Sequence, residues 1–411
     1  MKKIGILVFS NKHSISVGRD GRKDYSFDGV SGKGLHKILS ELNRPYEFCS
    51  RETIDDYDDA ICSLTSYHDV LNLVLNVPIG IKTRIHIGGP ACNNIRPILP
   101  YIETANFGRC DCGKINGIID GIKYKSVWRK SLDPEFLGEY EVDGSSVDGL
   151  SPEESSYGCR QKCAFCFYSH WNKHTEKNET GKYSSGFSSY EDFFQSLDWQ
   201  KCIRGGVTAL DGITEETRLK INKPIKKQDI IDTLLRSNKI ETETRLRVKV
   251  YCIAGYPWES RNEICGFDLV SALKEVEGDI RNKITIRMHF SHFIPFQKTP
   301  LWNAPFNFSN YRDWCLDHKV IYESGNVRLF SGGTFTPSPS QAAISTILQR
   351  AKNTDTWIVE RIASRDFQKI DSQRQIRIMK KEIPRFFCEQ TEESIGNIKT
   401  ANKYKAIRRA E

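Results

Sequence analysis

Short apolar runs alternate with helix-like segments over the first 125 residues, and this alternation constrains the fold more than any other feature. The runs IGILVF, DDAICSLTS and RIHIGGP predict buried strands at residues 4–9, 58–66 and 84–90. GKGLHKILSEL has the spacing of an amphipathic helix over 32–42, and IRPILPYI after the third run is also predicted to be helical. Strands that alternate with helices pair in parallel, so the sequence predicts a doubly wound α/β domain over residues 1–125.

A second α/β block covers residues 153–302, after a polar linker at 126–152 that contains glycine, serine and proline. Its alternation predicts a βα barrel, complete or partial, whose active site lies at the carboxyl ends of the strands. The last region, 303–411, starts irregular and is predicted to be mainly helical from about residue 340. The strands of the block are expected at 206–212, 245–257 and 283–296, and its helices at 190–199 and 226–238.

Length and composition limit the function classes. At 411 residues, 38% of them hydrophobic, the chain can bury two or three cores. Its first apolar run is too short for a signal peptide, and no stretch approaches the roughly 20 apolar residues that span a bilayer. We therefore expect a cytoplasmic protein without a membrane partner. The net charge of +8 favours the approach of an anionic substrate or of nucleic acid, although basic surfaces often serve only solubility.

The thirteen cysteines are an odd number in a chain without a secretory signal, which favours metal ligation over a disulfide framework. Cys159, Cys163 and Cys166 stand in the run CRQKCAFC, just after a predicted strand. Three thiolates within eight residues can wrap one metal centre from a single loop. An iron-sulfur cluster usually has four thiolate ligands, so three thiolates on a four-iron cluster leave one iron open for catalysis.

Zinc is the alternative metal, with His170 or His174 as the fourth ligand. Structural zinc sites usually take ligand pairs separated by a longer insert, whereas these cysteines form one tight triplet. The spacing therefore favours iron-sulfur. A zinc-stabilised nucleic-acid-binding protein without chemistry remains the alternative from another class.

The spacing Cys-x3-Cys-x2-Cys, with the aromatic Phe165 just before the third cysteine, resembles the signature of the radical S-adenosylmethionine (SAM) superfamily. The resemblance implies a [4Fe-4S] cluster on Cys159, Cys163 and Cys166, whose open iron chelates the amino and carboxylate groups of SAM. An electron from that cluster splits the sulfonium and gives methionine and a 5′-deoxyadenosyl radical. A reductant such as flavodoxin or ferredoxin is implied as a partner.

Three later segments resemble radical SAM proteins in the same order along the chain, namely TALDGITEETRLKINKPIKKQDI, VKVYCIAGYPWES and SHFIPFQKTPLW. The resemblance implies cofactor-binding roles at the strand ends, with Ile253 and Gly255 along the adenine of SAM. Each glycine taken alone could merely end a strand. The residues implied in cofactor binding are Phe165, Asp211, Gly212, Ile253, Gly255 and Glu259.

One spacing departs from this family. Only about 40 residues separate Cys166 from the strand at 206–212, where the family usually fits two further βα units. Either the barrel is abbreviated or this strand stands earlier in the barrel than the resemblance suggests. The residues that contact the SAM amino group therefore stay open.

The N-terminal block resembles the Rossmann-like, cobalamin-binding domain that some radical SAM proteins carry. HIGGPACN matches a strand and glycine pair that run under the corrin tail, which implies cofactor contacts at Gly88 and Gly89. The Asp-x-His-x-x-Gly loop that supplies a histidine to cobalt is absent, so His13 is predicted to be an ordinary loop residue. Cobalamin-dependent methyl transfer and a scaffold domain without cobalamin both remain open.

The expected activity is SAM-dependent radical modification of a small-molecule or nucleotide-like substrate. The enzymatic alternative is modification of RNA or DNA bases, similar to the methylthiotransferases. Those enzymes hold a second cluster on N-terminal cysteines, but the contexts of Cys49, Cys62 and Cys92 do not match that pattern and predict buried strand thiols. Cys110 and Cys112 form a Cys-x-Cys pair that could join a second site.

Overall fold

The computed structural model shows an α/β chain that divides into two compact units, each built on its own mostly parallel sheet. Unit 1 comprises Met1–Tyr157, Trp171–Tyr183 and Leu348–Asp371, and unit 2 comprises Gly158–His170, Ser184–Ile347 and Ser372–Glu411. In the described parts of the chain, no helix combines the length and apolar character that a bilayer crossing requires. The structure describes residues 3–7, 14–17, 23–27, 30–31, 33–111, 113–136, 140–142, 154–159, 161–171, 174–176, 183–185, 193–259, 267–308, 319–332 and 338–390.

The main sheet of unit 1 has six strands in the order β5-β1-β6-β7-β8-β9. All neighbours are parallel except β8 and β9. Counted along the chain, the first five strands of this sheet follow the order 2-1-3-4-5, which is the flavodoxin-like version of a doubly wound sheet. The strands are β1 (Ile4–Leu7), β5 (Tyr46–Cys49), β6 (Asp59–Ser63), β7 (Arg84–Gly88), β8 (Thr104–Asn106) and β9 (Val127–Arg129).

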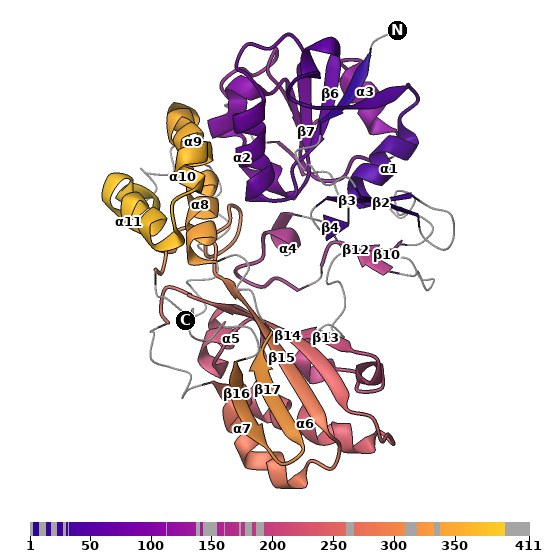
Figure 1. Cartoon of the computed structure of the whole chain (residues 1–411), viewed down its shortest axis with the longest axis vertical. Helices are drawn as coiled ribbons and strands as arrows, with labels where there is room; N and C mark the ends of the chain where they lie inside the picture. The colour runs from indigo at the N-terminus through magenta and orange to yellow at the C-terminus, as the bar shows by residue number, and fades with distance from the viewer. Residues whose placement is uncertain are drawn as a thin grey trace. The chain divides into compact units, whose positions relative to one another are not determined.

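The helices of unit 1 cover both faces of this sheet (Figure 1). α1 (Lys33–Glu41) and α3 (Lys114–Ile119) pack against the apolar side chains of β1 and β6, and α2 (Tyr67–Asn76) lies on the other side. The segment expected to be α-helical near residue 98 is instead the 3-10 helix η3 (Arg96–Tyr101). Its Pro100 has no N–H to donate and its ring would clash with an α-helical carbonyl, which explains the difference.

Two small sheets complete the description of the first half of the chain. The first is β2-β3-β4, and the second is β11-β10-β12. The strand expected just before the three cysteines is β10, which pairs in this second small sheet and not in the main sheet of either unit. Their bounds are β2 (Ser14–Val17), β3 (Lys23–Phe27), β4 (Val30–Ser31), β10 (Glu154–Tyr157), β11 (Thr175–Glu176) and β12 (Tyr183–Ser185).

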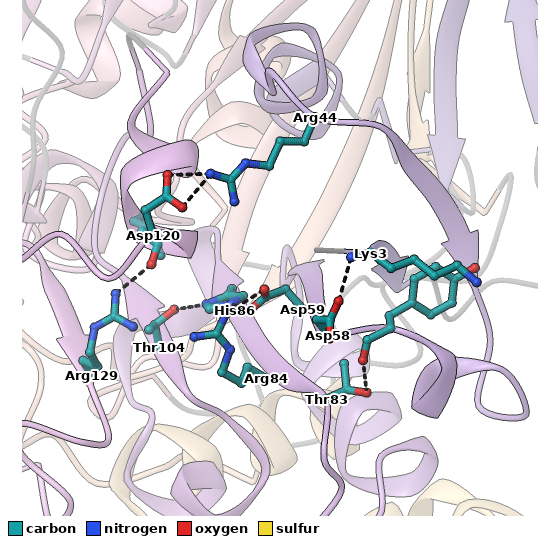
Figure 2. Close-up of polar contacts among 12 residues, drawn as sticks. Lys3, Arg44, Asp58, Asp59, Thr83, Arg84, His86, Thr104, Asp120 and Arg129 are labelled. Atoms are coloured by element: carbon teal, nitrogen blue, oxygen red, sulfur yellow. Dashed lines mark hydrogen bonds and ion pairs between the residues drawn. The ribbon is translucent and has the colours of Figure 1, made fainter. Parts of the chain in front are cut away.

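A buried polar network joins the amino ends of β6, β7 and β8 in unit 1 (Figure 2). The carboxylate of Asp59 accepts hydrogen bonds from Arg84 at 2.7 Å and from Nε2 of His86 at 2.7 Å. Burial alone would raise the pKa of Asp59, but these bonds outweigh it and lower that pKa, while burial lowers the pKa of His86. The pair is therefore a carboxylate and a neutral imidazole, whose Nδ1 accepts from Oγ1 of Thr104 at 2.8 Å.

We expect acid to destabilise unit 1 through this network. Both groups have lowered pKa values in the folded chain and regain values near 6.5 for His86 and 3.8 for Asp59 on unfolding. The unfolded chain therefore binds protons more readily than the folded chain. The stability that the network provides is complete above the unfolded pKa values and is lost as the pH falls below them. Replacing His86 by Gln keeps an N–H donor without a titrating group, and should flatten the loss between about pH 7 and pH 5. Denaturant unfolding at a series of pH values measures this effect.

An exposed carboxylate provides the control. At neutral pH, Asp59→Asn should lower the free energy of unfolding by about 1–3 kcal/mol, because a buried hydrogen-bonded charge is lost. Asp120→Asn removes an exposed carboxylate that pairs with Arg44 at 2.5 Å, and should cost less than about 1 kcal/mol. Equal losses in these two variants would contradict the assigned role of the network.

The sheet of unit 2 has the order β13-β14-β15-β17-β16, parallel except for the last pair. The described strands form an open sheet with edge strands β13 and β16, so they do not show the barrel that the sequence predicts. The strands expected from 206, 245 and 283 are confirmed, and the pair β16 and β17 was not expected. The bounds are β13 (Gly206–Ala209), β14 (Leu246–Ala254), β15 (Ile284–His292), β16 (Val320–Ser324) and β17 (Val327–Ser331).

One face of this sheet forms the core of unit 2. α6 (Lys227–Arg236) and α7 (Asp268–Val276) bury their apolar sides against alternate residues of β14 and β15 (Figure 1). The helix expected at 226–238 is thus confirmed, whereas the helix expected at 190–199 is only η5 (Phe194–Ser196) in the residues described there. Phe193 forms a parallel β-bridge with Ala209, and this pairing competes with helix formation.

Among the described residues, the C-terminal region is mainly helical from residue 339, as the sequence predicts. α9 contacts α2 within unit 1, where the hydroxyl of Tyr101 donates to Glu360 at 2.6 Å. The helices are α8 (Pro339–Arg350), α9 (Thr356–Ala363), α10 (Arg365–Gln368) and α11 (Ser372–Glu382).

Candidate functional site

The three cysteines lie on a loop of unit 2 over residues 158–166, which we call the cysteine loop. Cys159 and Cys163 are buried, and Cys166 is half-buried. The backbone N–H of Cys166 donates to the carbonyl of Cys163 at 3.0 Å, which closes a turn between the second and third thiols. The short helix α4 (Phe167–Trp171) begins directly after the third thiol.

A second segment, residues 221–223, holds the cysteine loop in place, and we call it the strap. The N–H of Ala164 donates to the carbonyl of Ile221 at 2.8 Å. The side-chain amide of Asn222 donates to the carbonyl of Lys162 at 3.0 Å. From another direction, the N–H of Leu301 donates to the carbonyl of Ala164 at 3.2 Å. The backbone on both sides of Cys163 is therefore fixed by distant parts of unit 2.

Apolar contacts place the cysteine loop at the carboxyl ends of β14 and β15. Ala164 belongs to one buried cluster with Ile221, Tyr256 and Phe293, and the last two residues closely follow β14 and β15. The ring of Phe165 meets that of Tyr256 edge to face, with centroids 6.3 Å apart. This is the edge at which active sites of parallel α/β sheets gather.

Asp211 follows β13 at the same edge, in a left-handed backbone conformation with φ of 56°. Its carboxylate forms an ion pair with Lys223 of the strap, whose side chain is fully buried. The ammonium of Lys223 also lies 4.0 Å from the ring centroid of Phe193. Burial raises the pKa of Cys163 to about 12, and the positive charge of Lys223 opposes this shift.

Gly212 follows Asp211 and lies close to α5 (Glu215–Lys220). A Cβ at this position would come within 2.8 Å of Cγ of Arg218. The guanidinium of Arg218 is buried, donates to the carbonyl of Gly212 at 3.2 Å and pairs with Asp268 at 2.7 Å. Packing inside the protein thus accounts for this glycine, and its implied contact with SAM stays a prediction.

The end of β14 carries Ile253, Gly255 and Glu259. Gly255 has φ of +88°, and a Cβ there would come within 2.6 Å of the ring of His292. The carboxylate of Glu259 accepts the N–H of Gly255 at 2.7 Å and that of Tyr256 at 3.2 Å, so it holds the turn that ends the strand. Ile253 is half-buried and packs against the cluster around Ala164. Contacts of these residues with adenine stay predictions.

The structure gives a reason for Gly255 that needs no cofactor. Gly255→Val should lower the free energy of unfolding by at least about 2 kcal/mol, because a branched residue would occupy a left-handed conformation and press on His292. Gly278→Val is the control, since a Cβ at Gly278 would meet none of the described residues within 4 Å. Denaturant unfolding of the cofactor-free chain measures both. If both variants unfold alike and only Gly255→Val loses SAM affinity, the adenine contact accounts for the glycine instead.

The donor set matches a cluster held by thiolates, with three cysteines on one loop and the third only half-buried. Within the described residues, no group of three His, Cys, Asp or Glu side chains is arranged to hold a single metal ion. His170, considered above as a zinc ligand, has Nε2 at 3.1 Å from the carbonyl oxygen of Cys163.

In unit 1, Gly88 and Gly89 end β7 at the carboxyl edge of the sheet. Gly89 has φ of +105°, and its Cβ would come within 2.5 Å of the carbonyl oxygen of Leu64, so local packing requires it. Among the described residues, a Cβ at Gly88 would meet only Asn106, at 3.9 Å, so they leave room at this position. His13 and Cys112 lie outside the described residues.

Cys49, Cys62 and Cys92 are buried, as the sequence predicts, but Cys92 does not lie on a strand, and Cys110 is half-buried. Cys49 ends β5, Cys62 lies within β6, and Cys92 lies in the 3-10 helix η2 (Pro90–Asn93). Burial raises the pKa of each of the three thiols.

Sequence reasoning did not single out three residues at the carboxyl edge of unit 2. They are Asn222 and Lys223 of the strap, and Tyr256, whose hydroxyl donates to the carbonyl of Asp211 at 2.9 Å. A signal existed for the first two, because Asn-Lys follows the predicted turn at Asp211 within the segment compared with radical SAM proteins.

Comparisons with known proteins add a weak structural similarity. No protein-family model and no curated protein matches the chain. Two solved structures of the cobalamin-dependent S-adenosylmethionine radical enzyme OxsB are similar to it. The first is the OxsB structure with aqua-cobalamin and S-adenosylmethionine bound. It has 10% sequence identity to this chain and a TM-score of 0.27, and the match covers 72% of this chain and 49% of OxsB. The second is the apo, selenomethionine-labelled form of OxsB. It has 11% sequence identity and a TM-score of 0.26, and the match covers 85% of this chain and 48% of OxsB. The chain thus spans about half the length of OxsB, and scores of this size assign no family.

Proposed function

We propose that this chain is a radical SAM enzyme. The observation that carries the proposal is the position of the Cys-x3-Cys-x2-Cys loop, whose Ala164 and Phe165 pack on residues that follow the parallel strands β14 and β15. Side chains from several strand ends meet at this edge, and catalytic groups of parallel α/β folds come from the same place.

In the proposed enzyme, Cys159, Cys163 and Cys166 hold a [4Fe-4S] cluster. When bound, such a cluster supplies the electron that splits the sulfonium of SAM, and a protein reductant such as flavodoxin or ferredoxin replaces that electron. The strap fixes the backbone on both sides of Cys163, so this part of the loop is ordered before a cluster binds. This preorganisation reduces the entropy that ordering the loop would cost on cluster binding.

The SAM-binding residues in this proposal are those of the strand ends. They are Asp211 and Gly212 after β13, Ile253 near the end of β14, and Gly255 and Glu259 after it. Glu259 acts through the turn it holds, because its carboxylate already accepts two backbone N–H groups. Ile253 is half-buried beside the Ala164 cluster and offers an apolar surface to an adenine ring.

Anaerobic purification followed by iron and sulfide analysis tests the proposal. The expected result is about four irons and four sulfides per chain, with release of 5′-deoxyadenosine when SAM and a reductant are added. One equivalent of zinc without sulfide would refute the proposal and support the zinc-stabilised alternative. Iron and sulfide without any SAM cleavage would also refute it, since the cluster would then serve another purpose.

We further propose that unit 1 binds cobalamin. Two features of this chain support it, the flavodoxin-like strand order and the open position at Gly88, on the carboxyl edge where doubly wound sheets bind ligands. Gly88 would let the nucleotide tail of a corrinoid pass along the end of β7. Methyl transfer is the reaction that a bound corrinoid would add to the radical chemistry.

Gly88→Leu is expected to prevent corrinoid uptake while leaving the iron content unchanged. The chain is incubated with hydroxocobalamin, separated from free corrinoid, and assayed by its visible spectrum and cobalt content. Gly278→Leu in unit 2, where a Cβ meets nothing within 4 Å, is the control and should take up as much corrinoid as the original chain. If the original chain itself leaves the column without cobalt, unit 1 is a scaffold domain, and the proposal of cobalamin-dependent methyl transfer is wrong.

A further inference from the structure

The second face of the unit 2 sheet carries charged and aromatic side chains that the core does not use. Along β14 and β15 every second residue is buried under the helices, and the residues between them are half-buried or exposed. We call this side of the sheet the open face. Its residues are Arg247, Lys249, Tyr251 and Ile253 on β14, Thr285, Arg287, His289 and Ser291 on β15, and Arg328 and Phe330 on β17.

The centre of the open face holds two cations side by side. Lys249 of β14 is in register with Arg287 of β15, and Arg287 is in register with Phe330 of β17. Among the described residues, no carboxylate forms an ion pair with either cation. Arg328, on the same face of β17, differs because it pairs with Glu323 at 2.5 Å. Within the described residues both cations lie near rings instead, with Nζ of Lys249 5.9 Å from the ring centroid of Tyr251 and Cζ of Arg287 5.2 Å from that of Phe330. These contacts leave the net charge of each cation in place.

The next row towards the carboxyl edge is aromatic. Tyr251 of β14 is in register with His289 of β15, and their ring centroids are 5.6 Å apart. Gly332, just beyond β17, has no side chain there, and a Cβ would come within 2.3 Å of Nε2 of His289. The glycine therefore leaves space for the imidazole beside the tyrosine. The two ring planes are inclined at 49°, so a planar ring can stack on one of them and meet the edge of the other.

These rows point towards the cysteine loop. Two residues along a strand advance roughly 6.6 Å, so Lys249, Tyr251 and Ile253 form three steps towards the carboxyl end of β14. Ile253, the last step, packs against the cluster that contains Ala164 of the cysteine loop. A ligand with its anion on the first row and its ring on the second would turn the far edge of that ring towards the loop.

We infer that the open face binds the substrate, and that this substrate is a nucleoside phosphate, with its phosphate between Lys249 and Arg287 and its base on Tyr251 and His289. The inference rests on the proposed function, because it takes the cysteine loop as the reacting end. Two neighbouring cations that no carboxylate of the described residues neutralises match a single phosphate group. One aromatic pair matches a single base, whereas a nucleic acid strand would use a longer series of cations and rings.

Equilibrium binding to the full chain tests the inference without any turnover. The four ribonucleoside 5′-monophosphates, adenosine and inorganic phosphate are titrated separately by calorimetry at low salt. At least one monophosphate should bind, and adenosine should bind at least about tenfold more weakly than AMP if AMP is that ligand. Lys249→Gln and Arg287→Gln should each weaken binding by roughly tenfold or more, because each removes a charge-assisted contact.

Matched variants separate the site from general effects of charge. Arg328→Gln removes a cation of the same face that Glu323 already neutralises, so affinity should change by less than about twofold. Lys249→Met and Arg287→Met keep the apolar stems, and circular dichroism shows whether each variant is folded. Tyr251→Ala should weaken nucleotide binding but leave the affinity for inorganic phosphate unchanged, because only the base loses its contact.

Three results would overturn the inference. The first is no binding of any monophosphate to a folded chain, and the second is unchanged affinity in both Gln variants. The third is a twelve-nucleotide single-stranded RNA that binds more than about tenfold tighter than every monophosphate, which would assign the face to nucleic acid. Iron content and 5′-deoxyadenosine release are measured on the same preparations, so the inference can fail while the proposed function stands.

Discussion

Cys163→Ala is expected to remove the iron and to reduce SAM cleavage by more than about 100-fold. Replacing a residue that only supports a metal ligand typically costs about 10- to 100-fold, and the loss of a ligand itself should cost more. Cys163 is the central thiol of the loop, and two thiolates cannot hold a four-iron cluster that leaves one iron open. The measurement is iron and sulfide per chain together with 5′-deoxyadenosine released on addition of SAM and reductant.

Cys202→Ala is the matched control for this prediction. Cys202 is another buried thiol of the unit 2 core, so its replacement also removes a sulfur and leaves a small cavity. It should retain both iron and cleavage. Asn222→Ala removes the strap contact to Lys162 and also places alanine in the left-handed conformation of Asn222, with φ of 57°. It should reduce iron retention by an intermediate factor of about 10- to 100-fold. Wild-type cleavage by Cys163→Ala would remove the basis for the cluster.

The elements predicted well from sequence are those with strong local patterns. β14 and β15 are nine residues long and alternate buried with partly exposed side chains, which is the period of a strand with one covered face. β1, β6 and β7 are short apolar runs, as expected of parallel strands covered on both sides. Doubly wound order follows from such runs separated by helices.

The elements missed depend on distant partners. β16 has no buried residue and is fixed as a strand by its antiparallel pairing with β17. Phe193 and Phe194 have the hydrophobicity of a helix face, but a bridge to Ala209 and burial in the core decide their conformation. Closure of a barrel depends on contacts between strands far apart in sequence, and no local pattern encodes it.

The same limit holds for the site. The thiols of the cysteine loop could be found because they are contiguous and their spacing is chemically specific. Gly255 looked like a place for a ligand, whereas its nearest neighbour is His292 on the adjacent strand. The strap could not be found by spacing, because its contacts to the loop join residues about 60 positions apart.

Lys223 is the residue of the strap whose loss should have the largest effect on stability. Its ammonium is fully buried between the carboxylate of Asp211 and the ring of Phe193. A buried pair of this kind adds little net stability compared with an apolar pair of similar shape, because both charges lose their hydration. Removal of one member is different, since the other charge then stays buried without its partner.

Lys223→Met should therefore lower the free energy of unfolding of unit 2 by about 3 kcal/mol. This value is at the lower end of the range for a broken buried pair, because the side chain of Asp211 keeps some exposure to solvent. Lys220→Met is the control, as its exposed pair with Glu216 is worth less than about 0.5 kcal/mol. The double variant Lys223→Met with Asp211→Asn should recover most of the loss, because no unpaired charge remains and asparagine tolerates the left-handed conformation of this position. Denaturant unfolding of the three variants measures these differences. Iron and sulfide analysis of the double variant shows separately whether the cluster depends on the positive charge of Lys223. Recovered stability with poor iron retention would show that the cation of Lys223 favours the thiolate form of Cys163, whereas recovery of both would limit the pair to holding the strap.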